Sequence, residues 1–139
     1  MTVLLDTHVW LWWLLGSERI AKKERQALDR LASRGALSIA AVSLWEAQML
    51  HEKSRLALDR PFDIWLREAA AADVVQVMPL DIEVVIELDN LSRSFHGDPA
   101  DRLIVSTSRA HKFPLATHDA AIRKSRVTTF WKPADGPIS

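Results

Sequence analysis

The chain has 139 residues, 48% of them apolar and 26% charged, values typical of one globular domain with a buried core. It contains no cysteine, which excludes disulfides and thiolate metal ligands, and no apolar run approaches the ~20 residues of a membrane span. The formal net charge of +0 excludes polyanion binding through overall charge, although seven basic residues stand against three acidic ones from Asp101 onward. These features favour a cytoplasmic protein that does not enter a membrane.

Short apolar runs alternate with helical patterns along the whole chain. The predicted strands, in chain order, are Val3–Leu5, Leu37–Ala40, residues 74–78, residues 113–117 and a last edge strand at residues 127–130. The predicted helices between and after them are residues 9–15, 18–33, 43–53, 61–72, 81–93 and 98–110, and a short basic helix after Asp119. This alternation predicts one α/β domain with a mostly parallel central sheet of four to five strands and helices on both faces. The domain is expected to cover residues 1–132, with a loose tail at residues 133–139.

Helix-start signals mark several of these boundaries. Ser17 and Asp81 are expected to cap the helices that follow them, and the sequence Ser-Leu-Trp-Glu at 43–46 matches a capping box. Asp98 is also a predicted cap, because a proline follows it at the first helical position and Asp101 falls in the first turn. Acidic residues therefore stand at several predicted helix starts.

Four acidic residues stand where predicted strands end or predicted helices begin: Asp6, Glu46, Asp101 and Asp119. Each has a simple alternative explanation, because an acid at a helix N-terminus stabilises the helix by roughly 0.3–1 kcal/mol. The strand ends of a parallel sheet share one edge, however, so four carboxylates there would crowd together and would need protons or a neutralising charge. A hard cation with oxygen ligands, such as Mg²⁺ or Mn²⁺, supplies that charge. The acids therefore indicate either helix caps or a metal site.

Four segments, spread over nearly the whole chain, carry a family resemblance: LLDTHVWLWWL at 4–14, SLWE at 43–46, DPADRLIV at 98–105 and LATHD at 115–119. In this order they resemble the PIN domain, a metal-dependent nuclease fold, and specifically the VapC-type toxins of bacterial toxin–antitoxin pairs. The resemblance implies a single PIN-like domain. It also implies an endoribonuclease that hydrolyses RNA phosphodiester bonds by means of a water activated by carboxylate-held Mg²⁺ or Mn²⁺.

The resemblance also implies roles for individual residues. The expected metal-binding and catalytic acids are Asp6, Glu46, Asp101 and Asp119. The expected supporting residues are Thr7, Thr117 and Asp98, and the candidate phosphate contacts are Arg102 and His118. The family's third acid usually stands directly before the apolar helix, which favours Asp101 over Asp98 as the closer ligand. One bound ion and two bound ions both remain open.

The resemblance further implies an RNA substrate, a cognate antitoxin protein and a homodimer. Exposed apolar surface on the helices after Asp6 and Ser43 is the expected antitoxin-docking groove, with Trp12 and Leu44 as the residues that test it. The other tryptophans of these two helices are expected to pack in the core or at a subunit contact: Trp10, Trp13 and Trp45.

Two alternatives compete with the nuclease interpretation. One is another carboxylate-dependent phosphotransfer enzyme, such as a receiver domain or a haloacid-dehalogenase-type phosphatase. The phosphatase needs a second acid two residues after its nucleophilic aspartate, but Thr7 and His8 follow Asp6. The other alternative is a non-catalytic PIN-like module that binds RNA or protein, and the full set of four acids disfavours it.

Overall fold

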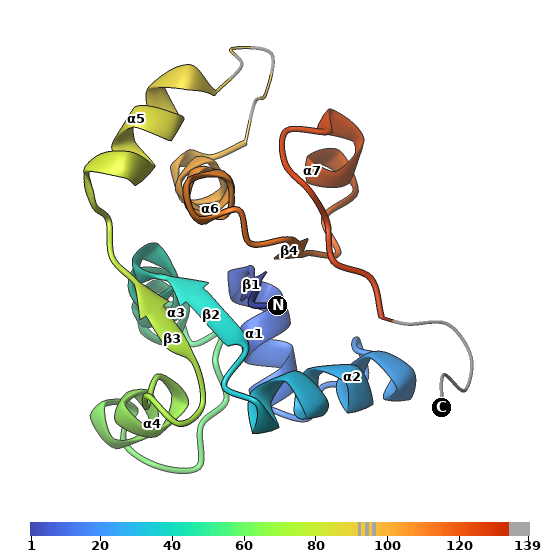
Figure 1. Cartoon of the computed structure of the whole chain (residues 1–139). Coiled ribbons are helices and arrows are strands. Elements are labelled where there is room, and N and C mark those ends of the chain that lie inside the picture. Colours follow the sequence, from blue (N-terminus) through green and yellow to red (C-terminus); the bar gives the residue numbers. More distant parts are fainter. Residues whose placement is uncertain (92, 94, 96, 134–139) are drawn as a thin grey trace.

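Four short parallel strands form the central sheet, in the order β3-β2-β1-β4. They are β1 (Val3–Leu5), β2 (Leu37–Ala40), β3 (Gln76–Met78) and β4 (Leu115–Ala116). The computed structural model describes residues 1–91, 93, 95 and 97–133 (Figure 1). Within the sheet Leu4 of β1 stands opposite Ser38 of β2 on one side and opposite Leu115 of β4 on the other. The prediction of a parallel α/β sheet with four strands is confirmed.

The helices of the described residues connect the strands and cover them. In chain order they are α1 (Thr7–Leu14), α2 (Lys22–Ser33), α3 (Ala41–Glu52), α4 (Phe62–Ala69), α5 (Ile82–Asn90), α6 (Pro99–His111) and α7 (Ala120–Ser125). In Figure 1, α2 and α4 lie below the sheet, and α5, α6 and α7 lie above it. Helices therefore cover both faces of the sheet, as the alternating pattern predicts.

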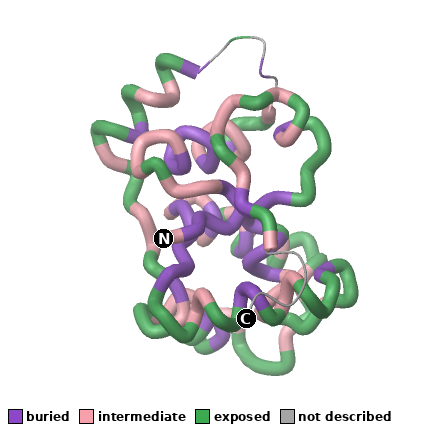
Figure 2. The backbone as a smooth tube through the Cα atoms, turned by 45° about the vertical axis from the view of Figure 1, so that its right-hand side comes forward, coloured by how far each residue is buried: buried purple, intermediate pink, exposed green. Residues whose placement is uncertain are grey.

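Alternate strand residues face two separate hydrophobic clusters, because successive side chains of a strand point to opposite faces of the sheet. The first cluster contains residues of α1, α2 and α4 together with Val3, Leu5, Leu37 and Ile39 of the sheet. The second contains residues of α6 and α7 together with Leu4, Ala40 and Leu115. Figure 2 shows the result as buried inner segments surrounded by exposed outer loops and helix faces.

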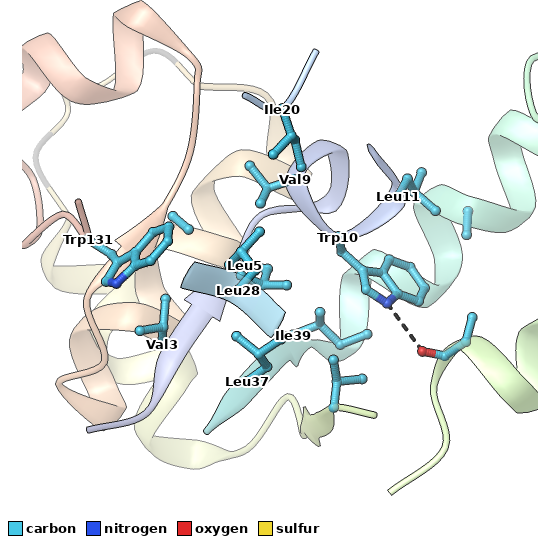
Figure 3. Packing of buried hydrophobic residues seen from close by; sticks show 14 of the residues in the cluster. Val3, Leu5, Val9, Trp10, Leu11, Ile20, Leu28, Leu37, Ile39 and Trp131 are labelled. Atoms are coloured by element: carbon cyan, nitrogen blue, oxygen red, sulfur yellow. Dashed lines mark hydrogen bonds between the residues drawn. The ribbon is translucent and has the colours of Figure 1, made fainter. Parts of the chain in front are cut away.

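Trp10 is the largest side chain that is fully buried in the first cluster. Its indole Nε1 donates a hydrogen bond of 3.3 Å to the carbonyl oxygen of Ala69 in α4, which Figure 3 shows as a dashed line. Its ring lies 6.1 Å from that of Trp65, centroid to centroid. This tryptophan therefore joins α1 to α4, and the prediction that it packs in the core is confirmed, whereas Trp45 is 53% exposed.

Two of the predicted helix caps are wrong. Helix α3 begins at Ala41, directly after β2, and no side chain caps it, so Ser43 lies inside the first turn and is fully buried. Helix α2 begins only at Lys22, with Ala21 as its N-cap, and the hydroxyl of Ser17 accepts a hydrogen bond from the backbone N–H of Arg19 instead. Tertiary contacts explain the first case, because the Ser43 hydroxyl has a partner outside its helix.

The last predicted strand is reduced to a single parallel bridge between Leu115 and Phe130. Two backbone hydrogen bonds flank it, from Leu115 to Thr129 and from Trp131 to Leu115. The predicted tail at 133–139 lies outside the described residues except for Pro133. Among the described residues, no helix has the length and apolar character that crossing a membrane requires.

Candidate metal centre

Helix capping and strand ends place the acidic side chains at one edge of the sheet. Asp6 follows β1 and caps α1, and its Oδ1 accepts a hydrogen bond of 2.8 Å from the backbone N–H of Val9. Asp119 follows β4 and caps α7 in the same way, at 2.9 Å from the N–H of Ile122. Each cap bond uses one lone pair of a carboxylate oxygen, and a carboxylate has further lone pairs for other ligands.

The remaining acids come from the starts of α3 and α6. Asp98 caps α6 and accepts a hydrogen bond of 2.8 Å from the backbone N–H of Asp101, which lies in the first turn as predicted. Glu46 stands on the second turn of α3. Asp6, Asp98 and Asp119 are therefore helix caps, whereas Glu46 and Asp101 are not.

All five acids line one cavity of about 380 Å³. The other described residues that line it are Thr7, His8, Trp12, Arg19, Ile104 and His118. We call this space the acid cavity. The predicted acids are thus brought together from four separate segments of the chain. Arg102 is not among its lining residues, because its guanidinium donates to the carbonyl oxygen of Phe95 at 2.9 Å.

Mutual repulsion and burial perturb the titration of these acids. The pKa of Asp101 is raised from 3.8 to about 7, first by burial and then by the neighbouring charges of Asp98, Glu46, Asp119 and Asp6 in that order of importance. Burial also raises the pKa of Asp6, against the lowering effect of a hydrogen bond to Thr117. The pKa of Glu46 is raised by burial as well, and the hydrogen bond from Thr7 opposes the shift. The cluster therefore carries more negative charge than its surroundings compensate.

These carboxylates form a donor set that suits a hydrated divalent cation. Among the described residues, no three His, Asp or Glu side chains are arranged to hold a metal ion directly. Mg²⁺ usually keeps several waters and binds proteins through one or two carboxylates, so direct contact with every acid is not required. Carboxylate oxygens fit such an ion, because a bound cation would neutralise the repulsion among the acids and displace the protons favoured by the raised pKa values of Asp6, Glu46 and Asp101.

Two threonines and one serine hold the acids in place. The Thr7 hydroxyl donates to the carboxylate of Glu46 and also makes a hydrogen bond of 2.8 Å with the hydroxyl of Ser43. The Thr117 hydroxyl accepts a hydrogen bond of 3.1 Å from the backbone N–H of Asp119. Sequence reasoning missed this role of Ser43, although its spacing of three residues from Glu46 puts both side chains on one helix face.

The wall opposite the acids is aromatic and basic. The ring of Trp12 lies 5.5 Å from the ring of His8 and 5.6 Å from that of His118, and the guanidinium of Arg19 lies over it at 5.5 Å. The Nε2 of His118 stands 2.6 Å and 2.8 Å from the two carboxylate oxygens of Glu24 in α2. Of these residues the sequence singled out only His118 and Trp12, and the i, i+4 spacing of His8 and Trp12 was the available signal.

We expect Asp101→Asn to stabilise the metal-free protein at pH 8. The folded chain holds the proton of Asp101 up to a pKa of about 7, whereas the unfolded chain releases it near the ordinary value of 3.8. The stability that this proton contributes is thus fully present below about pH 4 and is lost as the pH rises to about 7. Asparagine cannot ionise, so the free energy of unfolding of the Asp101→Asn variant should exceed that of the wild type by about 1–2 kcal/mol at pH 8, allowing for the screening of a half-exposed group.

Urea unfolding in EDTA at pH 4 and pH 8 measures this difference, with Asp63→Asn on the exposed side of α4 as the matched control. The control should show no gain at either pH. If Asp101→Asn raises the free energy of unfolding no more at pH 8 than at pH 4, the raised pKa of Asp101 is contradicted.

Comparison with known proteins agrees with this architecture. The sequence matches the family described as "PIN domain" over residues 3–126. It is 36% identical over 125 residues to "Ribonuclease VapC22" of Mycobacterium tuberculosis (strain ATCC 25618 / H37Rv), an alignment covering 90% of this chain and 92% of that protein.

Solved structures with the same fold are much less similar in sequence. VapBC2 from Rickettsia felis, bound to a DNA fragment from its promoter, superposes with a TM-score of 0.70 at 14% identity, covering 94% of this chain and 98% of that one. FitAcB from Neisseria gonorrhoeae superposes with a TM-score of 0.66 at 18% identity, covering 95% and 98%. At these identities the likeness establishes the fold alone.

Proposed function

The chain belongs to the PIN domain family, and from that premise we propose that it is a metal-dependent endoribonuclease, the toxin of a toxin–antitoxin pair. The observation that carries the proposal is the acid cavity, where carboxylates from four segments converge and the pKa of Asp101 rises to about 7. The sequence similarity to a named ribonuclease over 90% of the chain supports RNA as the substrate. PIN-domain ribonucleases generally require a metal, and we propose Mg²⁺ or Mn²⁺ here because carboxylate oxygens outnumber the imidazole nitrogens of His8 and His118 in the acid cavity.

Different side chains of the acid cavity would hold the ion and orient the carboxylates that bind it. A bound Mg²⁺ or Mn²⁺ would orient a water, lower its pKa and offset charge that builds on the phosphodiester. Asp6 and Asp119 are held by their cap bonds and line the acid cavity, so they would meet the ion with little reorientation. Glu46 is oriented by the Thr7 hydroxyl. Asp101, whose pKa is about 7, would release its proton when the cation binds near neutral pH.

Metal-dependent RNA cleavage tests the proposal directly. The full chain should cut a pool of single-stranded RNA of randomised sequence when Mg²⁺ or Mn²⁺ is present and should not cut it in EDTA. Cleavage that persists in EDTA would contradict the metal requirement. Metal binding by the chain without any cleavage of the pool would favour a non-catalytic PIN-like module instead.

An antitoxin protein is the partner in the same proposal, and Trp12 and Leu44 are the residues proposed at its docking surface. Trp12 is half-buried on the wall of the acid cavity, and Leu44 is half-buried against the first hydrophobic cluster. A peptide that covers the acid cavity would therefore contact Trp12 more directly than Leu44.

The expected homodimer is supported by a different surface. Large apolar side chains are exposed on α3, on α5 and just before α5: Trp45, Leu80, Ile82, Val85 and Ile86. Exposed apolar patches of this kind mark contacts between proteins. A monomer in sedimentation experiments at micromolar concentration would contradict this part of the proposal.

We also propose that the protein is located in the cytoplasm.

A further inference from the structure

A second and larger cavity, of about 540 Å³, lies beside the acid cavity. Its lining includes Lys23 and Glu24 of α2, His118 after β4, Arg123 of α7, and Trp131 and Lys132 near the end of the described chain. We call this space the basic cavity. The three segments that form it are far apart in the sequence, so no short sequence motif predicts this cavity.

The two cavities share a wall. His118 lines both of them, and Thr117, which lines the basic cavity, accepts a hydrogen bond from the backbone N–H of Asp119 in the acid cavity. The two cavities are therefore adjacent, and a ligand long enough to extend past His118 would contact both.

The charges of the two cavities are opposite. Among the described residues, Lys23, Arg123, Lys132 and His118 line the basic cavity against one acid, Glu24, whose carboxylate is already hydrogen-bonded to His118. The side chain of Glu24 is only 12% exposed, so little of its charge faces a ligand. The basic cavity therefore offers positive charge next to a cluster of five carboxylates.

The basic groups are suited to binding phosphate. One nitrogen of Arg123 donates to the carbonyl oxygen of Thr117 at 3.0 Å, and its guanidinium lies over the Phe130 ring at 5.5 Å. These contacts orient the guanidinium and leave most of its five donors free for an anion. Lys132 is exposed and has no hydrogen bond or ion pair to any other residue in the described part of the chain.

We propose that the basic cavity binds phosphates of the RNA strand on one side of the bond to be cleaved. This inference rests on the proposed ribonuclease function. An RNA strand carries a phosphate at every nucleotide, so it can place one phosphate among the basic side chains and the next against a cation held by the acids. An acidic peptide carries the same sign of charge and suits the basic cavity equally well. The similarity to a named ribonuclease over 90% of the chain favours RNA as the occupant.

RNA binding measured without cleavage tests this inference. The full chain carrying Asp119→Asn is titrated against a labelled pool of single-stranded RNA of randomised sequence in Mg²⁺, with fluorescence polarisation as the readout. Adding Arg123→Gln and Lys132→Gln should weaken binding roughly 10- to 30-fold at 0.1 M salt. It should also lower the slope of log affinity against log salt by about 1.4, because each phosphate contact on a single strand contributes about 0.7.

A matched control removes the same charge elsewhere. Arg30→Gln with Arg67→Gln neutralises two exposed arginines, on α2 and α4, that line neither cavity. Equal weakening by the control pair, or unchanged binding in the test pair, would overturn the inference. Lys132→Gln alone should lower the slope by about 0.7, and it breaks no contact among the described residues that could disturb folding.

The remaining outcomes separate this inference from the proposed function. If the wild-type chain cuts the RNA pool with Mg²⁺ while the test pair binds it normally, the ribonuclease function stands and the basic cavity has another role. A labelled oligoglutamate peptide that loses affinity in the test pair, while RNA does not, would assign the cavity to a protein partner. If the wild type neither binds nor cuts the pool, both proposals fall.

Discussion

Replacing Asp6 or Asp119 by asparagine should reduce metal-dependent RNA cleavage by at least about 100-fold without unfolding the protein, since even residues that merely orient metal ligands are worth 10- to 100-fold. Both acids cap helices through one oxygen, and asparagine caps as well as aspartate does. The substitution therefore removes a charge from the acid cavity while it keeps the hydrogen bonds to the N–H groups of Val9 and Ile122.

The measurement is cleavage of single-stranded RNA in Mg²⁺ or Mn²⁺, with wild type, both variants and an exposed-acid control purified in the same way. Asp73→Asn serves as that control, because it removes the same charge from an exposed position outside the acid cavity. Circular dichroism should be unchanged in all four proteins, and no variant should unfold at a lower temperature than the wild type. Full cleavage by either cavity variant would show that the carboxylate is only a cap.

Trp10→Ala should lower the free energy of unfolding by about 3–5 kcal/mol, a large share of the 5–15 kcal/mol typical of a domain. The side chain is fully buried, so the substitution leaves a cavity between α1 and α4. It also leaves the carbonyl oxygen of Ala69 without its indole donor. Because α1 begins directly after Asp6, loosening this helix should also disturb the acid cavity.

Urea unfolding compares this variant with Ile64→Ala, which truncates a half-exposed side chain on the same helix that Trp10 contacts. Ile64→Ala should lower the free energy of unfolding by less than half as much as Trp10→Ala. The loss for Trp10→Phe should lie between these two values, since phenylalanine keeps most of the apolar volume and loses the hydrogen bond. A Trp10→Ala variant as stable as the control would mean that α1 and α4 do not pack as described.

Local signals were reliable where one residue acts on its own helix. Asp98 and Asp81 cap α6 and α5 as predicted, because each side chain reaches the N–H three residues ahead. The apolar runs at Val3–Leu5 and Leu37–Ala40 form strands with the predicted bounds. The predicted strand at residues 113–117 shortens to Leu115–Ala116, because the bounds of a short strand depend on its pairing partners.

Local signals failed where a tertiary partner competed. The capping-box pattern at 43–46 is present in the sequence, yet Ser43 bonds Thr7, thirty-six residues away, and α3 starts two residues earlier. The Ser43 hydroxyl is fully buried, and leaving a buried polar group unpaired costs more than a lost cap.

The sequence alone determined the alternation of strands and helices, the acids at strand ends and helix starts, and the family that these segments resemble. Each of these depends on residues a few positions apart. Only the tertiary structure decided that five acids share one cavity, that the pKa of Asp101 rises to about 7, and that a basic cavity adjoins it across His118. Burial, Coulomb repulsion and hydrogen bonding act over a few ångströms of space, and they join residues that lie up to about a hundred positions apart in the chain.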